Sequence, residues 1–149
     1  MAKKEAPKVS EMRKMFNLIR HPLEFQPRDV MQLIVGAAIL AVPVGFTEET
    51  WRLGDTLPIG NVFGLLAISL LFISLFVYYN YYRHHFKEQW DECIKRVIST
   101  YLVAFLVVGI LLTIIQKAPW AMDWLLAVKR TIIVAFPSSM SAAVADMIK

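Results

Sequence analysis

The sequence predicts an all-α membrane protein with about four transmembrane helices. Three stretches carry no charged side chain and are too apolar for a soluble core: 30–46, 62–79 and 97–115. Each approaches or reaches the roughly 18–20 residues that a helix needs to cross about 30 Å of hydrocarbon. Composition agrees, because apolar residues make up 57% of the chain and charged residues only 19%. A fourth stretch, 131–148, is similar in character but weaker.

Residues 1–26 are predicted to be a basic cytoplasmic tail that includes a short amphipathic helix, and residues 27–149 the transmembrane domain. Apolar side chains recur at helical spacing before Pro22, which ends the pattern. This helix either lies in the headgroup layer or packs in the cytosol against a neighbouring subunit. Both interpretations make it an anchor. The apolar positions are Met12, Met15, Phe16 and Ile19.

The distribution of basic residues predicts the orientation. Seven Lys and Arg side chains precede the first span, whereas the following loop contains only Arg52. Because Lys and Arg accumulate on the cytoplasmic side, the amino terminus is expected to be cytoplasmic. The next turn is again basic, which agrees. No cleavable signal peptide is recognisable, so a bacterial inner (plasma) membrane is the simplest location. The basic residues of that turn are Arg83, Lys87, Lys95 and Arg96.

The expected spans follow in order along the chain. Pro27 suits the first turn of the first helix, and Asp29 suits the positive end of its dipole. Pro43 is expected to kink this helix, and Pro137 to kink the fourth. Aromatic residues beside the spans are expected to anchor them at the membrane–water interface, namely Trp51, Tyr81, Tyr82 and Trp90. The predicted spans are 29–47, 60–83, 96–116 and 130–148.

The fourth crossing is complicated by Lys129 and Arg130. In one interpretation, residues 120–128 lie along the outer surface and the crossing starts at Thr131. In the other, one long helix tilts and the two basic side chains reach toward the interface. Both place positive charge outside, against the usual bias.

The first and fourth spans resemble each other when aligned on their prolines. Residues 39–47 lie over residues 133–141, with three identities. Because the two segments run in opposite directions, an inverted repeat is indicated, in which helices interrupted by proline meet near mid-membrane and line a pathway. Alternatively, the similarity is that of any two apolar helices, each with a tolerated proline kink.

The candidate pore or ion-binding residues lie near these prolines. Glu48 and Glu49 follow the first span, and in a symmetric oligomer one glutamate per subunit would form an acidic ring that concentrates cations. They also fit a solvated loop, paired with Arg52. Asp146 is expected at the inner interface, and His84 and His85 either sense pH or only mark the headgroup boundary. The further candidates for oxygen ligands are Thr47, Ser138 and Ser141.

No catalytic constellation is present in the sequence, so the chain is expected not to be an enzyme. It has no His-Glu-x-x-His, Gly-rich phosphate loop or serine elbow. Three histidines and the single Cys93, which are scattered, predict no metal or cofactor site. The net charge of +4 is explained by membrane topology, so no nucleic-acid partner is expected.

Two segments, PVGFTEETW (43–51) and FPSSMSAAVAD (136–146), resemble signatures of a family of bacterial integral membrane proteins that carries a domain of unknown function. The similarity covers the chain from about Pro27 onward. It implies a polytopic inner-membrane protein and supplies no activity. Members associated with this family are longer and have more spans. If they hold a second three-helix unit, the resemblance implies that this shorter chain completes its packing by forming oligomers.

The leading functional hypothesis is a small homo-oligomeric channel for inorganic cations in the lipid bilayer. Pro43 and Pro137 would bend the pore-lining helices, and Glu49 would set charge selectivity, with oxygen ligands from Thr47 and Ser141. The alternative is a non-transporting scaffold that binds lipids or protein partners. A proton-coupled transporter is a third option, but no carboxylate is expected at mid-depth.

Overall fold

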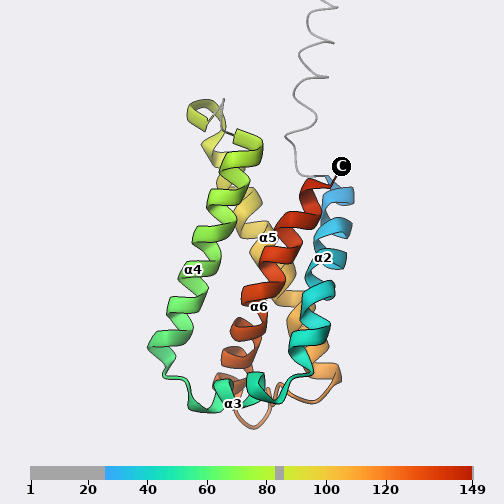
Figure 1. Cartoon of the computed structure of the whole chain (residues 1–149), viewed down its shortest axis with the longest axis vertical. Helices are drawn as coiled ribbons and strands as arrows, with labels where there is room; N and C mark the ends of the chain where they lie inside the picture. Colours follow the sequence, from blue (N-terminus) through green and yellow to red (C-terminus); the bar gives the residue numbers. More distant parts are fainter. Residues whose placement is uncertain (1–25, 83–85, 149) are drawn as a thin grey trace, which may run out of the picture.

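The computed structural model describes residues 26–82 and 86–148, with the side chains of 82 and 86–89 left out. This part of the chain is helical and contains no strand. Four helices are each long and apolar enough to span a membrane, which confirms the predicted class. The elements are α2 (Pro27–Gly45), α3 (Glu48–Thr56), α4 (Ile59–Val77), the π-helical turn η1 (Tyr78–Tyr82), α5 (Phe86–Ile114) and α6 (Trp124–Met147) (Figure 1).

Several predictions fall outside the described residues. The amphipathic helix expected within 1–26 is one of them, and His84 and His85 are two more. The predicted kinks at Pro43 and Pro137 stay predictions, because both prolines lie inside helices that continue past them.

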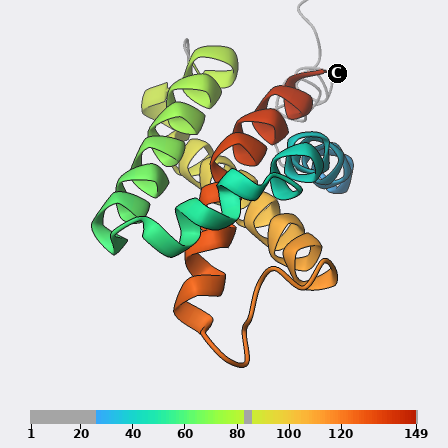
Figure 2. The ribbon, with the colours of Figure 1, turned by 60° about the horizontal axis from the view of Figure 1, so that its bottom comes forward.

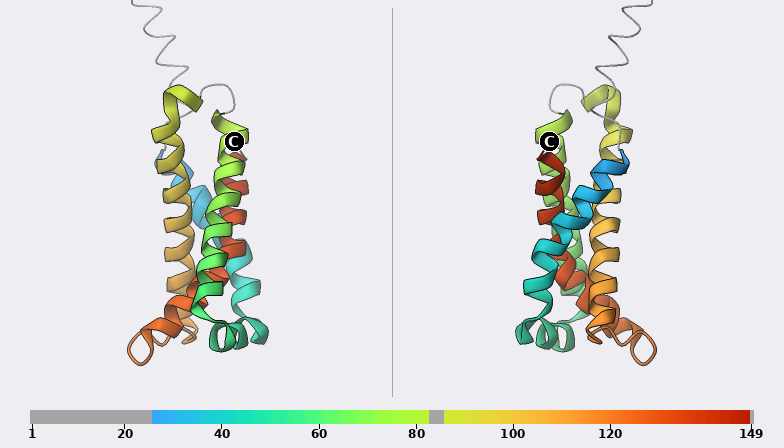
Figure 3. Two further views of the ribbon diagram at one scale, coloured as in Figure 1. Left: turned by 90° about the vertical axis from the view of Figure 1, so that its left-hand side faces the viewer. Right: turned by 90° about the vertical axis from the view of Figure 1, so that its right-hand side faces the viewer.

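The four long helices run in alternating directions and form a bundle (Figures 1 and 3). The start of α2 and the end of α6 lie at what we call the upper end, and α3 lies across the lower end. Helix α6 packs against all of α2, α3, α4 and α5, and half of its candidate span is buried (50%), against 22% for α4. The core therefore forms around α6, with α4 at the periphery.

Helices α2 and α6 pack closely against each other, because small residues face each other there. A Cβ atom added to Gly36 would lie 2.5 Å from the Cβ of Ala145 and 2.9 Å from the Cα of Ala142. Small residues allow helix backbones to approach closely, which is the usual way that membrane helices gain van der Waals contact.

Helix α6 is a single long helix across the region that the two interpretations of the fourth crossing describe. The side chain of Asp123 accepts a hydrogen bond from the backbone N–H of Leu126 (3.0 Å) and so caps the start. The helix then continues without a break through Lys129 and Arg130 to Met147. This continuity matches the single long helix of the second interpretation, while the tilt of the helix and the reach of its basic side chains toward the interface stay predictions.

Arg130 is accommodated inside the protein at the lower end. Its guanidinium pairs with Asp55 (Nη2–Oδ1, 3.1 Å) and donates to the backbone carbonyl of Lys117 (2.8 Å). The Arg130 guanidinium and the Lys117 ammonium each lie 5.7 Å from the ring centroid of Trp51. Figure 2 shows α3, which carries Trp51 and Asp55, crossing this end of the bundle. A positive charge in the fourth span is thus held by α3 and the α5–α6 connection.

Candidate functional site: a buried ionic cluster

The most unusual feature of the bundle is a group of charged side chains buried at its upper end. Asp29 comes from the first turn of α2, Arg96 from α5 and Asp146 from the last turn of α6. Their side chains are only 1–2% exposed. Tyr81 of η1 completes what we call the ionic cluster, so the connection that follows α4 takes part as well.

Arg96 lies at the centre of the cluster. Its Nη2 and Nε atoms both donate to Oδ2 of Asp146, at 2.7 and 2.9 Å. The same Nη2 lies 3.4 Å from Oδ2 of Asp29. The guanidinium carbon lies 4.1 Å from the ring centroid of Tyr81, in a cation–π contact. One arginine therefore links four elements of the fold.

Two further hydrogen bonds hold the Asp146 backbone and the Asp29 carboxylate in place. The Tyr81 hydroxyl donates to the backbone carbonyl of Asp146 at 2.9 Å and lies 3.4 Å from its Oδ2. The backbone N–H of Gln26 donates to Oδ2 of Asp29 at 3.1 Å. The acid at the third helical residue thus bonds the chain before the helix, as in a capping box.

The helix dipoles act in opposite senses on the two carboxylates of the cluster. The positive end of the α2 dipole lies at Asp29 and favours its charge, but the negative end of the α6 dipole lies at Asp146 and opposes it. The guanidinium of Arg96, which contacts both carboxylates, is therefore most needed at Asp146, where its two shortest contacts lie.

Three buried oxygen atoms around the cluster have no hydrogen-bond partner among the described residues. They are Oδ1 of Asp146, Oγ1 of Thr100 and Oε1 of Gln32. Thr100 follows Arg96 by one turn of α5, and Gln32 follows Asp29 by one turn of α2. The amide nitrogen of Gln32 donates to the carbonyl of Ile148 (2.8 Å), which holds this side chain against the end of α6.

The pore residues predicted from the sequence lie elsewhere and do not form one site within the bundle. Thr47, Glu48 and Glu49 are exposed at the lower end, where α3 begins. Ser138 is fully buried, and its hydroxyl donates to the Val134 carbonyl of its own helix (2.8 Å). Ser141 is half-buried.

The two prolines also differ in their surroundings. Pro43 lies on the exposed surface of the bundle, whereas Pro137 is half-buried. The bundle interior around α6 consists mainly of small and aliphatic residues. Within this bundle, the two prolines thus do not line a common polar interior.

The residues predicted as interface anchors have different environments. Trp51 is buried (9% exposed) at the lower end, where its ring contacts the side chains of Lys117 and Arg130. Tyr81 belongs to the ionic cluster, Trp90 is exposed (53%), and the side chain of Tyr82 lies outside the described part.

Sequence reasoning did not bring the three charged residues of the cluster together. Asp29 was assigned to a helix dipole, Asp146 to an interface and Arg96 to a basic turn. A usable signal was nevertheless present. With alternating directions, the start of the first span, the start of the third and the end of the fourth all lie on the same side of the membrane, so these three charges share one depth.

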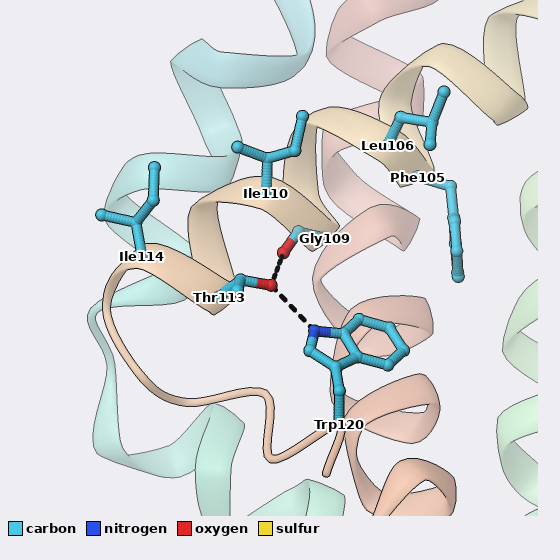
Figure 4. A pocket seen from close by; sticks show the side chains of 7 residues that line it. All are labelled: Phe105, Leu106, Gly109, Ile110, Thr113, Ile114 and Trp120. Carbon is cyan, nitrogen blue, oxygen red and sulfur yellow. Dashed lines mark hydrogen bonds between the residues drawn. The ribbon is translucent and has the colours of Figure 1, made fainter.

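An apolar groove lies on the outer face of α5 near the lower end (Figure 4). It has a volume of about 320 Å³. Trp120 closes it by donating its indole N–H to Oγ1 of Thr113 (2.8 Å), and that hydroxyl donates to the carbonyl of Gly109 (2.6 Å). The polar atoms thus satisfy each other, and the groove offers a hydrocarbon-like surface. The other lining residues are Phe105, Leu106, Ile110 and Ile114.

Four apolar spanning helices around a buried ionic cluster define a polytopic integral membrane protein. The family model described as "Putative integral membrane protein (DUF2391)" matches residues 2–148 of the 149-residue chain. The chain belongs to this family, which confirms the resemblance found in the sequence and extends it toward the amino terminus. No curated protein and no solved structure matches the chain.

Proposed function

We propose that the protein is a small homo-oligomeric membrane channel that conducts cations along a path between subunits. The observation that carries this proposal is the exposed acidic start of α3. Glu48 and Glu49 are exposed, as are Thr47 directly before them and Pro43 one turn earlier, near the lower end of the bundle. Around a symmetry axis, these carboxylates would form a ring that attracts cations to a pore mouth.

The path is assigned to the space between subunits because the interior of one subunit is already occupied. The hydroxyls of Thr131 and Ser138 donate to carbonyls of α6 itself, at 2.7 and 2.8 Å. Away from the ionic cluster, apolar residues make up most of the described core between the helices. A single bundle of four helices thus leaves no continuous polar route in this proposal.

The outward face of α2 would form the narrow part of the path. From Met31 to Val42 its exposed side chains are apolar, among them Met31, Val35, Ile39 and Val42, whereas Arg28 is exposed in its first turn. Hydrophobic constrictions gate channels by excluding water. The proposal therefore combines an acidic mouth with an apolar gate. In this proposal the protein lies in the inner membrane of a bacterium, with the upper end of the bundle facing the cytoplasm. The proposal assigns the protein no enzymatic role.

The same apolar face favours a second candidate, a scaffold that transports nothing. A stripe of large apolar side chains along one helix can pack against another membrane protein as readily as against lipid or a second subunit. In this alternative, Glu48 and Glu49 are solvated residues of a connecting helix, and the bound partner is lipid or a second membrane protein.

Conductance of the purified protein in planar bilayers tests the channel. We expect a cation-selective current, and Glu49→Gln should lower the ratio of cation to anion permeability several-fold, with an additional effect of Glu48→Gln. Glu92→Gln is the matched control, because Glu92 pairs with Lys95 far from α3, at the other end of the bundle. Absence of current at all voltages, pH values and cations tried would contradict the channel. Co-purification of one specific partner would then support the scaffold.

A further inference from the structure

The apolar groove on α5 lies at the end of the third span, beside the connection to α6. Its lining residues on α5 fall within 105–114, the last part of the candidate span Trp90–Ile114. At 1.5 Å per residue, this part of the helix is about 14 Å long. Figure 4 shows the connection running from Ile114 to Trp120 along the border of the groove. An elongated apolar molecule in the groove would thus lie along the helix, with one end at the connection.

Two tryptophans place the connection at the boundary between hydrocarbon and water. Trp120 closes the groove, and Trp124 begins α6; both side chains are exposed. Because tryptophan is enriched at this boundary in membrane proteins, the connection lies at the depth of lipid headgroups and the groove at the depth of acyl chains.

The groove offers an occupant apolar contact and no free polar side chain. Its two polar side chains are already bonded, the Trp120 indole to the Thr113 hydroxyl (2.8 Å) and that hydroxyl to the Gly109 carbonyl (2.6 Å). A Cβ atom added to Gly109 would lie 4.0 Å from Cζ2 of Trp120 and 3.9 Å from Cγ2 of Thr131. The absence of a side chain at Gly109 therefore keeps the space beside the indole ring open. An acyl chain fits such a surface, because it has no polar group to satisfy.

A basic side chain lies on the connection that borders the groove. Lys117 is exposed, and its backbone N–H donates to the carbonyl of Leu112 (2.9 Å), which holds it against the last turn of α5. Its ammonium lies 5.7 Å from the centroid of the Trp51 ring. A ring contact occupies one side of an ammonium group, so donors of Lys117 stay available for an anionic partner.

Two acids of the neighbouring segments are engaged by other groups. Asp55 pairs with Arg130 (3.1 Å), and Oδ1 of Asp123 accepts from the backbone N–H of Leu126 at the start of α6 (3.0 Å). In the part of the chain that the structure describes, no carboxylate forms an ion pair with Lys117. The connection thus presents a positive charge at the depth of the headgroups, next to a groove that suits an acyl chain.

We propose that the groove binds an anionic phospholipid, with one acyl chain along α5 and the phosphate group beside Lys117. An ammonium and a phosphate oxygen form a charge-assisted hydrogen bond. A zwitterionic headgroup carries its own cation, which competes with Lys117 for the phosphate, so the site prefers a headgroup with a net negative charge. No residue of the proposed channel takes part, so the protein can bind the lipid even if it conducts nothing.

Fluorescence of Trp120 tests the site, because a brominated acyl chain quenches the indole that it contacts. Trp90→Phe and Trp124→Phe remove two exposed indoles, whereas Trp51 is buried and gives a constant background. The full chain with these two substitutions is titrated in detergent micelles with phosphatidylglycerol or phosphatidylcholine that carries the same brominated chains. At low ionic strength, we expect half-maximal quenching at a several-fold lower mole fraction of phosphatidylglycerol.

Three further substitutions in this background assign the preference to the groove. Lys117→Gln should remove the difference between the two lipids, whereas Lys95→Gln, at an exposed position near the other end of the bundle, should keep it. Gly109→Leu places a side chain in the groove, so half-maximal quenching should require several-fold more of either lipid. Lys117→Gln carries the test if Gly109→Leu does not fold, because position 117 is exposed.

Four outcomes would overturn the proposal. One is half-maximal quenching at the same mole fraction of both lipids, and another is a preference that persists in Lys117→Gln. The third is an equal loss of the preference in Lys95→Gln, which would indicate a general effect of surface charge. The fourth is a Trp120 that neither lipid quenches, in a protein that light scattering shows to be a dimer. A second copy of the chain would then cover the groove.

Discussion

Nη2 of Arg96 lies 2.7 Å from Oδ2 of Asp146, and both side chains are almost fully buried. This contact links α5 to the last turn of α6. Because removal of one partner leaves a buried charge without its counter-ion, Arg96→Met should lower the free energy of unfolding by about 3–5 kcal/mol. Reversible unfolding in mixed detergent micelles measures the change.

The neighbouring residue Lys95 provides the control for this substitution. Its side chain is 69% exposed and pairs with the partly exposed Glu92, so Lys95→Met should change the stability by less than about 0.5 kcal/mol. A combined Asp29→Asn, Arg96→Met and Asp146→Asn variant should recover much of the loss, because no net charge then stays buried. Equal effects of Arg96→Met and Lys95→Met would contradict a structural role for the cluster.

The architecture could be predicted from the sequence because it depends on the length of uninterrupted apolar segments. A chain that must satisfy all its backbone groups within hydrocarbon has few choices besides helices. The apolar run 97–115, for example, lies within α5 (Phe86–Ile114) except for its last residue. Helix starts were also readable, as Pro27 and Asp29 at the start of α2 illustrate.

The candidate site could not be predicted in the same way, because it depends on which faces of distant helices meet. Asp29 and Asp146 are separated by more than a hundred residues, and the sequence alone does not give the rotation of each helix. Each of the two residues also had a separate explanation at the end of its own span: the helix dipole for Asp29 and the membrane interface for Asp146. Only the buried position of Arg96, inside the candidate span Trp90–Ile114, makes the joint assignment necessary.

The contact between α2 and α6 yields a steric prediction. Gly36→Ala should destabilise the protein by about 1–3 kcal/mol, because the added Cβ would come within 2.5 Å of Ala145 and the helices would have to move apart. Gly64→Ala in α4 is the matched control, since a Cβ there meets nothing within 4 Å and alanine favours the helix. Thermal unfolding midpoints of the two variants should change in opposite directions. A similar midpoint for both would show that α2 and α6 are not closely packed.

The lower end has its own stabilising group, centred on Arg130. Arg130→Lys keeps the charge but cannot reproduce bonds to both Asp55 and the Lys117 carbonyl, because the two distances of 3.1 and 2.8 Å come from different guanidinium nitrogens. We expect a loss of about 1–2 kcal/mol in unfolding free energy and faster proteolysis within α3. Arg52→Lys, at an exposed position of α3, is the control. Unchanged proteolysis of the Arg130 variant would argue that α3 is held by other contacts.

The proposed orientation can be tested with single cysteines at the two ends of the bundle. Cys93 is buried (5% exposed), so Cys93→Ser removes the native thiol with little effect on accessibility elsewhere. In that background, Glu48→Cys lies at the exposed start of α3, and Glu92→Cys lies near the upper end. Because Lys and Arg favour the cytoplasmic side, a membrane-impermeant maleimide applied to intact cells should label position 48 and spare position 92. Permeabilised cells should allow labelling of both. The reverse pattern would invert the orientation and move the acidic mouth of the proposed channel to the cytoplasm.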